Sequence, residues 1–243
     1  MELQQFLDAA REHIHPDIKI RYKEEEGWWR KLLPKTYKDS WTTMGTDIWA
    51  PTRDRVEDPL WITSTVAVFL HECGHVEDRH QGAVGFYGRY TAPQIMSALL
   101  AAIVIAAEFV FGFPFHWAIP LSIVFVFPLL PWPSPLRVGL EQNPYAIGTW
   151  IRIRQYLNMN DATLRAEAEA SLSKALRGWL YYKMVWRKKT ADRLAREIFN
   201  EAVKWCMEEA IGATPQPFRN AQFNNTVVEL LDKPRRRIWR PAE

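Results

Sequence analysis

The chain has 243 residues, of which 48% are hydrophobic and 24% are charged, and it carries a formal net charge of +3. This length suits one large domain, or one domain with an appendage, and the apolar share is sufficient to form a core. The small net charge does not in itself indicate nucleic-acid binding. The 12 tryptophans predict either an aromatic core or a surface that lies at an interface.

The N-terminal segment MELQQFLDAAREHIHPD contains acidic residues and no long apolar run, so we expect no signal peptide. Cys73 and Cys206 are the two cysteines of the chain. Cys73 lies inside a histidine motif described below, where a disulfide would disturb the motif. We therefore expect two free thiols in a reducing compartment.

Helical and extended patterns alternate along the first part of the chain. Residues 2–13 predict an amphipathic helix, and residues 18–27 alternate apolar and charged side chains like a strand with one wet face. Residues 37–51 are rich in Tyr, Trp, Thr and Ile and end at a proline, which predicts a further strand or hairpin arm. Within it, residues 46–50 are the expected edge strand.

The motif HECGH lies within residues 60–81, which predict one long helix. Positions four apart share a helix face, so His71 and His75 can point their imidazoles at one metal ion. Glu72 would then lie beside the ion without binding it, where it can act as general base. The alternative is two surface histidines on an amphipathic helix. The spacing favours zinc, because HExxH arises by chance in only about one sequence in a hundred.

A catalytic zinc requires a third protein ligand and one open position. The metzincin pattern would place a histidine at position 81, and Gln81 excludes that class. A carboxylate is the remaining common choice. Glu108 lies inside an apolar run, whereas Glu141 stands at the start of the next soluble helix, so we predict Glu141 as the third ligand.

Two acidic residues directly after the motif have a different expected role. Glu77 and Asp78 follow His75 too closely to reach round to the same ion. Asp78, one turn beyond His75, is better placed to accept a hydrogen bond from a ligand imidazole.

Residues 95–130 form the most apolar part of the chain. The run 95–113 contains one charge, Glu108, and the run 115–130 contains no Asp, Glu, Lys or Arg. The two runs predict a helical hairpin that leaves the body and returns, with Gln94 and Trp132 close together. Its surface would contact lipid or be buried against protein, and the sequence leaves both possibilities open.

Basic residues flank the hairpin on both sides. Arg79 and Arg89 precede it and Arg137 follows it, so its ends would lie on the cytoplasmic side of a membrane. After the hairpin we expect a helix beyond Pro144 and two further amphipathic helices. The basic tail, residues 233–243, would be a solvated terminus, with contact to phosphate groups of lipid or nucleic acid as the alternative.

These motifs resemble those of gluzincin zinc peptidases, in which HExxH supplies two ligands and a glutamate on a later helix supplies the third. The compact form with an edge strand and two zinc-binding helices resembles the minigluzincins. The chain resembles most the small metallopeptidases predicted from tailed phages, which share the following order of elements: Pro51, HExxH, RYTAPQ, an apolar stretch, PSPLR, Glu141 to Tyr145, and Tyr181-Tyr182-Lys183-Met184. The resemblance covers about residues 40 to 190 and implies a phage-encoded peptidase associated with a virion or membrane.

The expected fold is α+β and mainly helical, with a small antiparallel sheet whose edge strand lies over the HExxH helix, and a hydrophobic hairpin. Four parts are expected. Residues 1–93 would contain the strands and the HExxH helix, and residues 94–132 would form the hairpin. Residues 133–232 would be a helical remainder with the third zinc ligand, followed by the tail, residues 233–243.

The expected function is zinc-dependent peptide hydrolysis, with Glu72 as base. The edge strand would bind the peptide substrate by β-augmentation through Thr46, Asp47, Ile48 and Trp49. Donors to the developing oxyanion would come from Tyr182, Tyr181 or Arg137. The alternative is a non-proteolytic structural protein of a virion or membrane assembly that keeps a zinc-binding scaffold.

Overall fold

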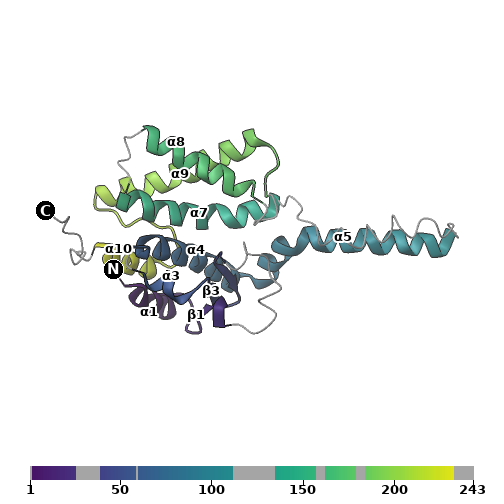
Figure 1. The fold of residues 1–243 in the computed structure, drawn as a ribbon, viewed down its shortest axis with the longest axis horizontal. Helices are drawn as coiled ribbons and strands as arrows, with labels where there is room; N and C mark the ends of the chain where they lie inside the picture. Colours follow the sequence, from purple (N-terminus) through teal and green to yellow (C-terminus); the bar gives the residue numbers. More distant parts are fainter. Residues whose placement is uncertain are drawn as a thin grey trace.

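The computed structural model describes residues 2–25, 39–58, 60–111, 135–156, 162–178 and 184–232. It is mainly helical with a small mixed sheet, which confirms the predicted α+β class. Figure 1 shows two layers, one with the sheet, α1, α3, α4 and α10, and one with α7, α8 and α9, while α5 reaches away from both. A single apolar core joins the two layers.

The N-terminal helix α1 (Leu3–His13) forms where the sequence predicts it. Phe6, Leu7 and Ala10 lie on one face and are buried. The C-terminal helix α10 (Ala221–Asp232) packs against α1 and so joins the two ends of the chain. Asn220 caps α10 by accepting a hydrogen bond from the Phe223 amide.

The sheet contains β1 (Lys19–Tyr22), β2 (Thr42–Met44) and β3 (Asp47–Ala50) in the order β1-β3-β2. The β2–β3 pair is antiparallel, as expected, but β1 and β3 are parallel, so the sheet is mixed. A two-residue turn joins β2 to β3, and Gly45 in it has a φ of 74°, a region that glycine adopts without strain. A 3-10 turn, η1 (Lys23–Glu25), follows β1.

The predicted edge strand is the central strand of the sheet. β3 pairs on one side with β1 and on the other with β2, so its backbone groups are already used. The proline at position 51 lies just after β3 and therefore does not restrict the strand's pairing. The strand at the edge, next to the HExxH helix, is β2.

The central helix of the molecule is α4 (Ile62–Gln81), which confirms the long helix expected around HECGH. A short helix, α3 (Arg53–Glu57), precedes it, and the Thr52 side chain caps α3. From Val66 to Glu77 nearly every residue of α4 is buried, because the sheet side and α7 cover opposite faces of the helix. The motif therefore lies inside the body of the molecule.

Helix α5 (Ala83–Phe111) follows α4 almost at once and projects from the body (Figure 1). The boundary expected at residues 93 and 94 lies inside this helix, so the apolar run continues an element that begins beside the motif. Among the described residues, no helix combines the length and apolar character needed to cross a membrane. Six large apolar or aromatic side chains described on α5 are exposed: Val84, Tyr87, Ile95, Met96, Leu99 and Ile103.

The second layer consists of α7 (Pro135–Tyr156), α8 (Ala162–Leu176) and α9 (Lys188–Ala210). Helix α7 packs against both α4 and α9. It begins well before Pro144, which lies inside it, so the expected start beyond Pro144 is wrong. Proline removes one backbone hydrogen bond from a helix, but the burial of α7 between two helices compensates for this loss.

Several predictions fall outside the described residues. They concern the second run of the hairpin, Trp132, the pair Tyr181 and Tyr182, and the basic tail. Cys73 and Cys206 are both free, as expected, and both are buried.

Candidate metal centre

Three predicted ligands come together in the core, between α4 and α7. His71 and His75 lie on one face of α4, and Glu141 faces them from α7. All three are buried, and Glu141 is completely inaccessible. Their ligand atoms all lie within 4.8 Å of one another, and among the described residues this is the group that could hold a metal ion.

The spacing of the ligand atoms fits a tetrahedral ion. Oε2 of Glu141 lies 3.5 Å from Nε2 of His71 and 3.3 Å from Nε2 of His75. Zinc binds such atoms at about 2.1 Å, so tetrahedral geometry separates two ligand atoms by roughly 3.4 Å. A direct charge-assisted hydrogen bond would be shorter, at about 2.7 to 2.9 Å. The residues therefore fit a zinc ion.

The electrostatics of the three side chains are strongly coupled. Burial disfavours a charge on His75, but the negative charge of the Glu141 carboxylate outweighs burial and raises the pKa of His75 to about 9. Burial also opposes the charge on Glu141, yet the two imidazoles hold the pKa of this carboxyl far below its usual value. Positive charge on the imidazoles, or on a metal ion in their place, thus stabilises the ionised form of Glu141.

The candidate base, Glu72, lies next to the ligands and is buried. The hydroxyl of Thr43 on β2 donates a hydrogen bond to Oε2 of Glu72 over 2.6 Å. The edge strand therefore fixes the orientation of the carboxylate. Cys73, the next residue, faces the core, and burial raises the pKa of its thiol well above the usual value, so it remains protonated.

Asp78 does not make the predicted hydrogen bond to a ligand imidazole. Its carboxylate accepts a hydrogen bond from Arg219, and Nδ1 of His75 is buried with no hydrogen-bond partner in the described part of the chain. Glu77 accepts hydrogen bonds from the backbone amides of Arg219 and Asn220. Both acidic residues thus attach α4 to the segment before α10.

Three of the four predicted substrate-binding residues, Asp47, Ile48 and Trp49, lie on β3 and make contacts elsewhere in the fold. Asp47 forms an ion pair with Arg21 over 2.6 Å, and the Arg21 guanidinium also lies over the Trp49 ring. Ile48 is fully buried in the core. The prediction for these residues assumed that β3 is the edge strand. Because β3 is the central strand, no peptide can pair with it, and the prediction is wrong.

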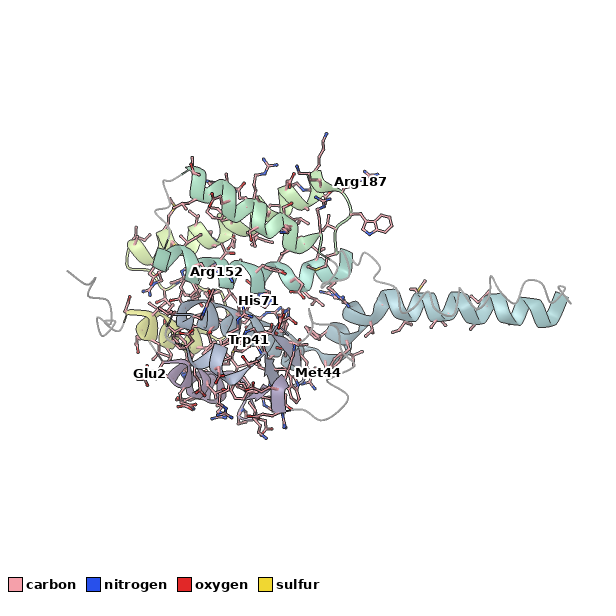
Figure 2. All side chains as sticks on the ribbon, viewed as in Figure 1. Glu2, Trp41, Met44, His71, Arg152 and Arg187 are labelled. Atoms are coloured by element: carbon pink, nitrogen blue, oxygen red, sulfur yellow. The ribbon has the colours of Figure 1, made fainter. Side chains whose placement is uncertain are left out.

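A cavity of about 680 Å³ adjoins the centre on one side. His71, Glu72 and Tyr145 line it at the metal end, and the loop before β2, α4, α7 and α8 form its walls. In Figure 2, His71, Trp41 and Arg152 all lie within the body of the molecule, away from the projecting α5. The candidate base is therefore accessible from a space large enough for part of a substrate.

Tyr145 is a site residue for which sequence analysis predicted no separate role. Its ring centre lies 5.0 Å from that of His71, nearly perpendicular to it, and the residue lines the cavity. Tyr145 follows Glu141 by one helical turn, so the spacing Glu-x-x-x-Tyr was the signal that it shares the face of the ligand. The predicted donor Arg137 is buried one turn before Glu141 and is not among the cavity residues.

The other side of the centre is closed by the start of α5. The ring of Phe86 lies 6.2 Å from that of His75, measured between centroids. Helix α5 contacts both α4 and α7 there. The centre thus has one covered side and one side open to the cavity.

Comparisons with models of protein families, with curated proteins and with solved structures give no match to this chain.

Proposed function

We propose that this protein is a zinc-dependent metallopeptidase. The observation that carries the proposal is the buried group of His71, His75 and Glu141, whose ligand atoms are spaced for a tetrahedral ion. Two histidines and one glutamate form a donor set of catalytic zinc sites, which leave one position open for water or substrate. Glu72, between the ligands and the cavity, supports catalysis over a purely structural zinc site.

The chain's own groups can divide the work of hydrolysis. When bound, zinc would polarise the scissile carbonyl and lower the pKa of a water molecule toward 7. Glu72 would accept the proton from the attacking water and later deliver it to the leaving amine. Thr43 would hold the Glu72 carboxylate in position. Tyr145, beside His71, would donate a hydrogen bond to the developing oxyanion.

The strand that would align the peptide is β2. In the described part of the chain β2 pairs only with β3, and Thr43 places it next to Glu72. An extended peptide added to its outer edge would run past the base and toward the cavity. The residues of β2, Thr42, Thr43 and Met44, would therefore bind the peptide backbone, a role that the sequence predicted for β3.

The projecting helix suggests where the enzyme acts. Apolar side chains on α5 are exposed, and a surface of this kind is usually covered by lipid or by a partner protein. We therefore propose that the protein acts at the cytoplasmic face of a membrane or within a phage virion. Replacing residues 95–130 by a short Gly/Ser bridge should give a folded protein that still binds zinc.

Glu72→Gln tests the proposal against the structural alternative. It removes the base and retains the three ligands, so the variant should bind zinc normally. We expect cleavage of a proteome-derived peptide library by the wild type and a loss of about 100-fold or more in the variant. Equal behaviour of the two zinc-loaded proteins would favour a non-proteolytic scaffold.

A further inference from the structure

We infer that the cavity selects peptides with a carboxylate group a few residues from the cleaved bond, and that Arg152 binds this group. The inference rests on the proposed peptidase function and adds a substrate class to it. It depends on where Arg152 lies on α7, on the charges around it and on the walls of the cavity.

The position of Arg152 follows from the geometry of α7. Glu141, Tyr145 and Arg152 are separated by four and seven positions, so they lie along one face of this helix. Arg152 and Tyr145 both line the cavity. Seven residues of helix rise about 10.5 Å, which equals roughly three residues of an extended peptide. A substrate bound at the metal end would therefore reach Arg152 about three residues from the cleaved bond.

The direction of the cavity follows from the packing of α4 on α7. Gly74 of α4 lies against Pro144 of α7, and Gly148, further along α7, lies against the backbone oxygen of Ala67. The two helices are thus antiparallel. The cavity begins at His71 and runs toward the start of α4, where Trp61 lines it. Along α7 the same direction leads toward Arg152.

The charge of Arg152 lacks a carboxylate partner within the described residues. Its neighbour Arg154 pairs with Glu209 and Asp232, and Arg165 pairs with Glu169. The side chain of Arg152 is exposed to solvent, and its guanidinium remains protonated at any working pH. It is therefore available to a ligand, and its planar donors fit a carboxylate.

The other charges of the cavity do not neutralise this group. Asp39 and Glu167 also line the cavity, but neither forms an ion pair with Arg152. A second cation, Arg55, lies over the ring of Trp61 at 5.9 Å. Much of the remaining lining is apolar and would accept the side chains between the cleaved bond and the acidic group: Trp41, Val68, Leu164 and Leu172.

The test is peptide binding to the zinc-loaded Glu72→Gln protein, which should bind peptides without cleaving them. Short peptides with blocked ends carry Asp, Asn or Lys at each position in turn, and a further peptide carries its only carboxylate at a free C-terminus. We expect one position at which Asp binds about 10-fold more tightly than Asn. The two arms distinguish an acidic side chain from a chain terminus as the source of the carboxylate.

Variants of Arg152 assign the effect. In the Glu72→Gln background, Arg152→Gln should abolish the preference for Asp, Arg152→Glu should reverse it in favour of Lys, and Arg152→Lys should retain part of it. Arg193→Gln, on the exposed surface of α9, is the control and should change nothing. A preference for Asp that survives in Arg152→Gln, equal binding of the three peptides, or no binding at all would overturn the inference.

The result is separable from the proposed function. Cleavage by the wild type without an acidic preference would leave the peptidase standing and remove the role of Arg152. A preference for Asp that depends on Arg152, together with no cleavage by the wild type, would support the binding site and contradict the peptidase.

Discussion

Oε2 of Glu141 lies 3.3 Å from Nε2 of His75, although residues 76–140, which include the whole of α5, separate the two in the sequence. The contact brings the second turn of α7 against the HExxH face of α4. It depends on a close approach of the two helices, which α5 permits by leaving the body beside His75. The site is therefore a property of the α4–α7 interface.

Gly74→Ala should disturb this interface. A Cβ at position 74 would lie 3.3 Å from Cγ of Pro144 and 3.4 Å from Cδ1 of Ile147, both of which are buried and fixed in α7. We expect a loss of about 1 to 3 kcal/mol in the free energy of unfolding and weaker zinc binding. Urea denaturation of the zinc-free protein measures the first, and a zinc titration measures the second.

Gly139→Ala is the matched control, since a Cβ there meets nothing within 4 Å. It lies in α7, and it should leave zinc binding unchanged and increase stability by up to about 1 kcal/mol. If Gly74→Ala behaved like Gly139→Ala, the close packing of α4 on α7 would not be needed for the site.

Thr43→Val should reduce turnover and leave the metal in place. Valine keeps the shape of threonine in the edge strand but cannot donate the hydrogen bond to Glu72. A misplaced base lowers kcat, and we expect a loss of about 10- to 100-fold with little change in KM or zinc content. Thr43→Ser restores a hydroxyl and should recover most of the activity. An unchanged kcat in Thr43→Val would contradict a positioning role.

Tyr145→Phe should separate the phenol hydroxyl from the packing of the ring. The ring contact with His71 would remain, so zinc binding should be unchanged. If the hydroxyl stabilises the oxyanion, kcat should decrease by about 100- to 1000-fold. Tyr87→Phe on α5 is the control, because Tyr87 is exposed and does not line the cavity. Unchanged activity in Tyr145→Phe would show that another residue donates the hydrogen bond to the oxyanion.

Much of the candidate metal centre could be predicted from the sequence because its signals are local. The four-residue spacing of HExxH places His71 and His75 on one face of a helix, and the same motif identifies Glu72 as the candidate base. Glu141 required a choice among carboxylates, and its place after the apolar run decided it. These three ligands converge in the core as expected.

The parts that failed depend on long-range pairing. β3 was expected at the edge, but strand order depends on β1, which pairs with β3 in parallel across a long connection. Asp78 was assigned from its helical spacing, yet Arg219 near the C-terminus pairs with it. Neither partner has a sequence signal that points to the motif. Tyr145 was within reach of sequence analysis, since it stands one turn after Glu141.

The stability of the metal-free protein should depend on pH through His75. The pKa of His75 is about 9 in the folded state, above its ordinary value of 6.5, so the folded state binds the proton more tightly. Its contribution to stability is fully present below about pH 6.5 and is lost as the pH rises through 9. The pKa of Glu141 is lowered, so its contribution is present above the usual 4.5 and is lost as the pH falls further. Thermal unfolding in the presence of a chelator measures both.

Zinc should cancel the alkaline part of this dependence. The ion binds the neutral imidazole and displaces the proton that His75 holds below about pH 9, so the affinity for zinc should increase between about pH 6.5 and 9. The zinc-loaded protein should therefore keep its stability over this range, where the metal-free protein loses it. His75→Gln should abolish the decrease between pH 6.5 and 9 in the metal-free protein. The same slope with and without zinc would show that His75 does not bind the ion.

The most direct measurement is a zinc titration of the metal-free wild type, of Glu141→Gln and of Glu197→Gln, followed by metal analysis of the folded proteins. The wild type and Glu197→Gln, a variant of an exposed glutamate on α9, should each bind one zinc per chain with equal affinity. Glu141→Gln loses a charged ligand from the core, so its affinity should decrease by more than the 10- to 100-fold typical of residues that only support a ligand. A folded wild type that binds no zinc, or a Glu141→Gln variant that binds it as tightly as the wild type, would contradict the assignment of this site.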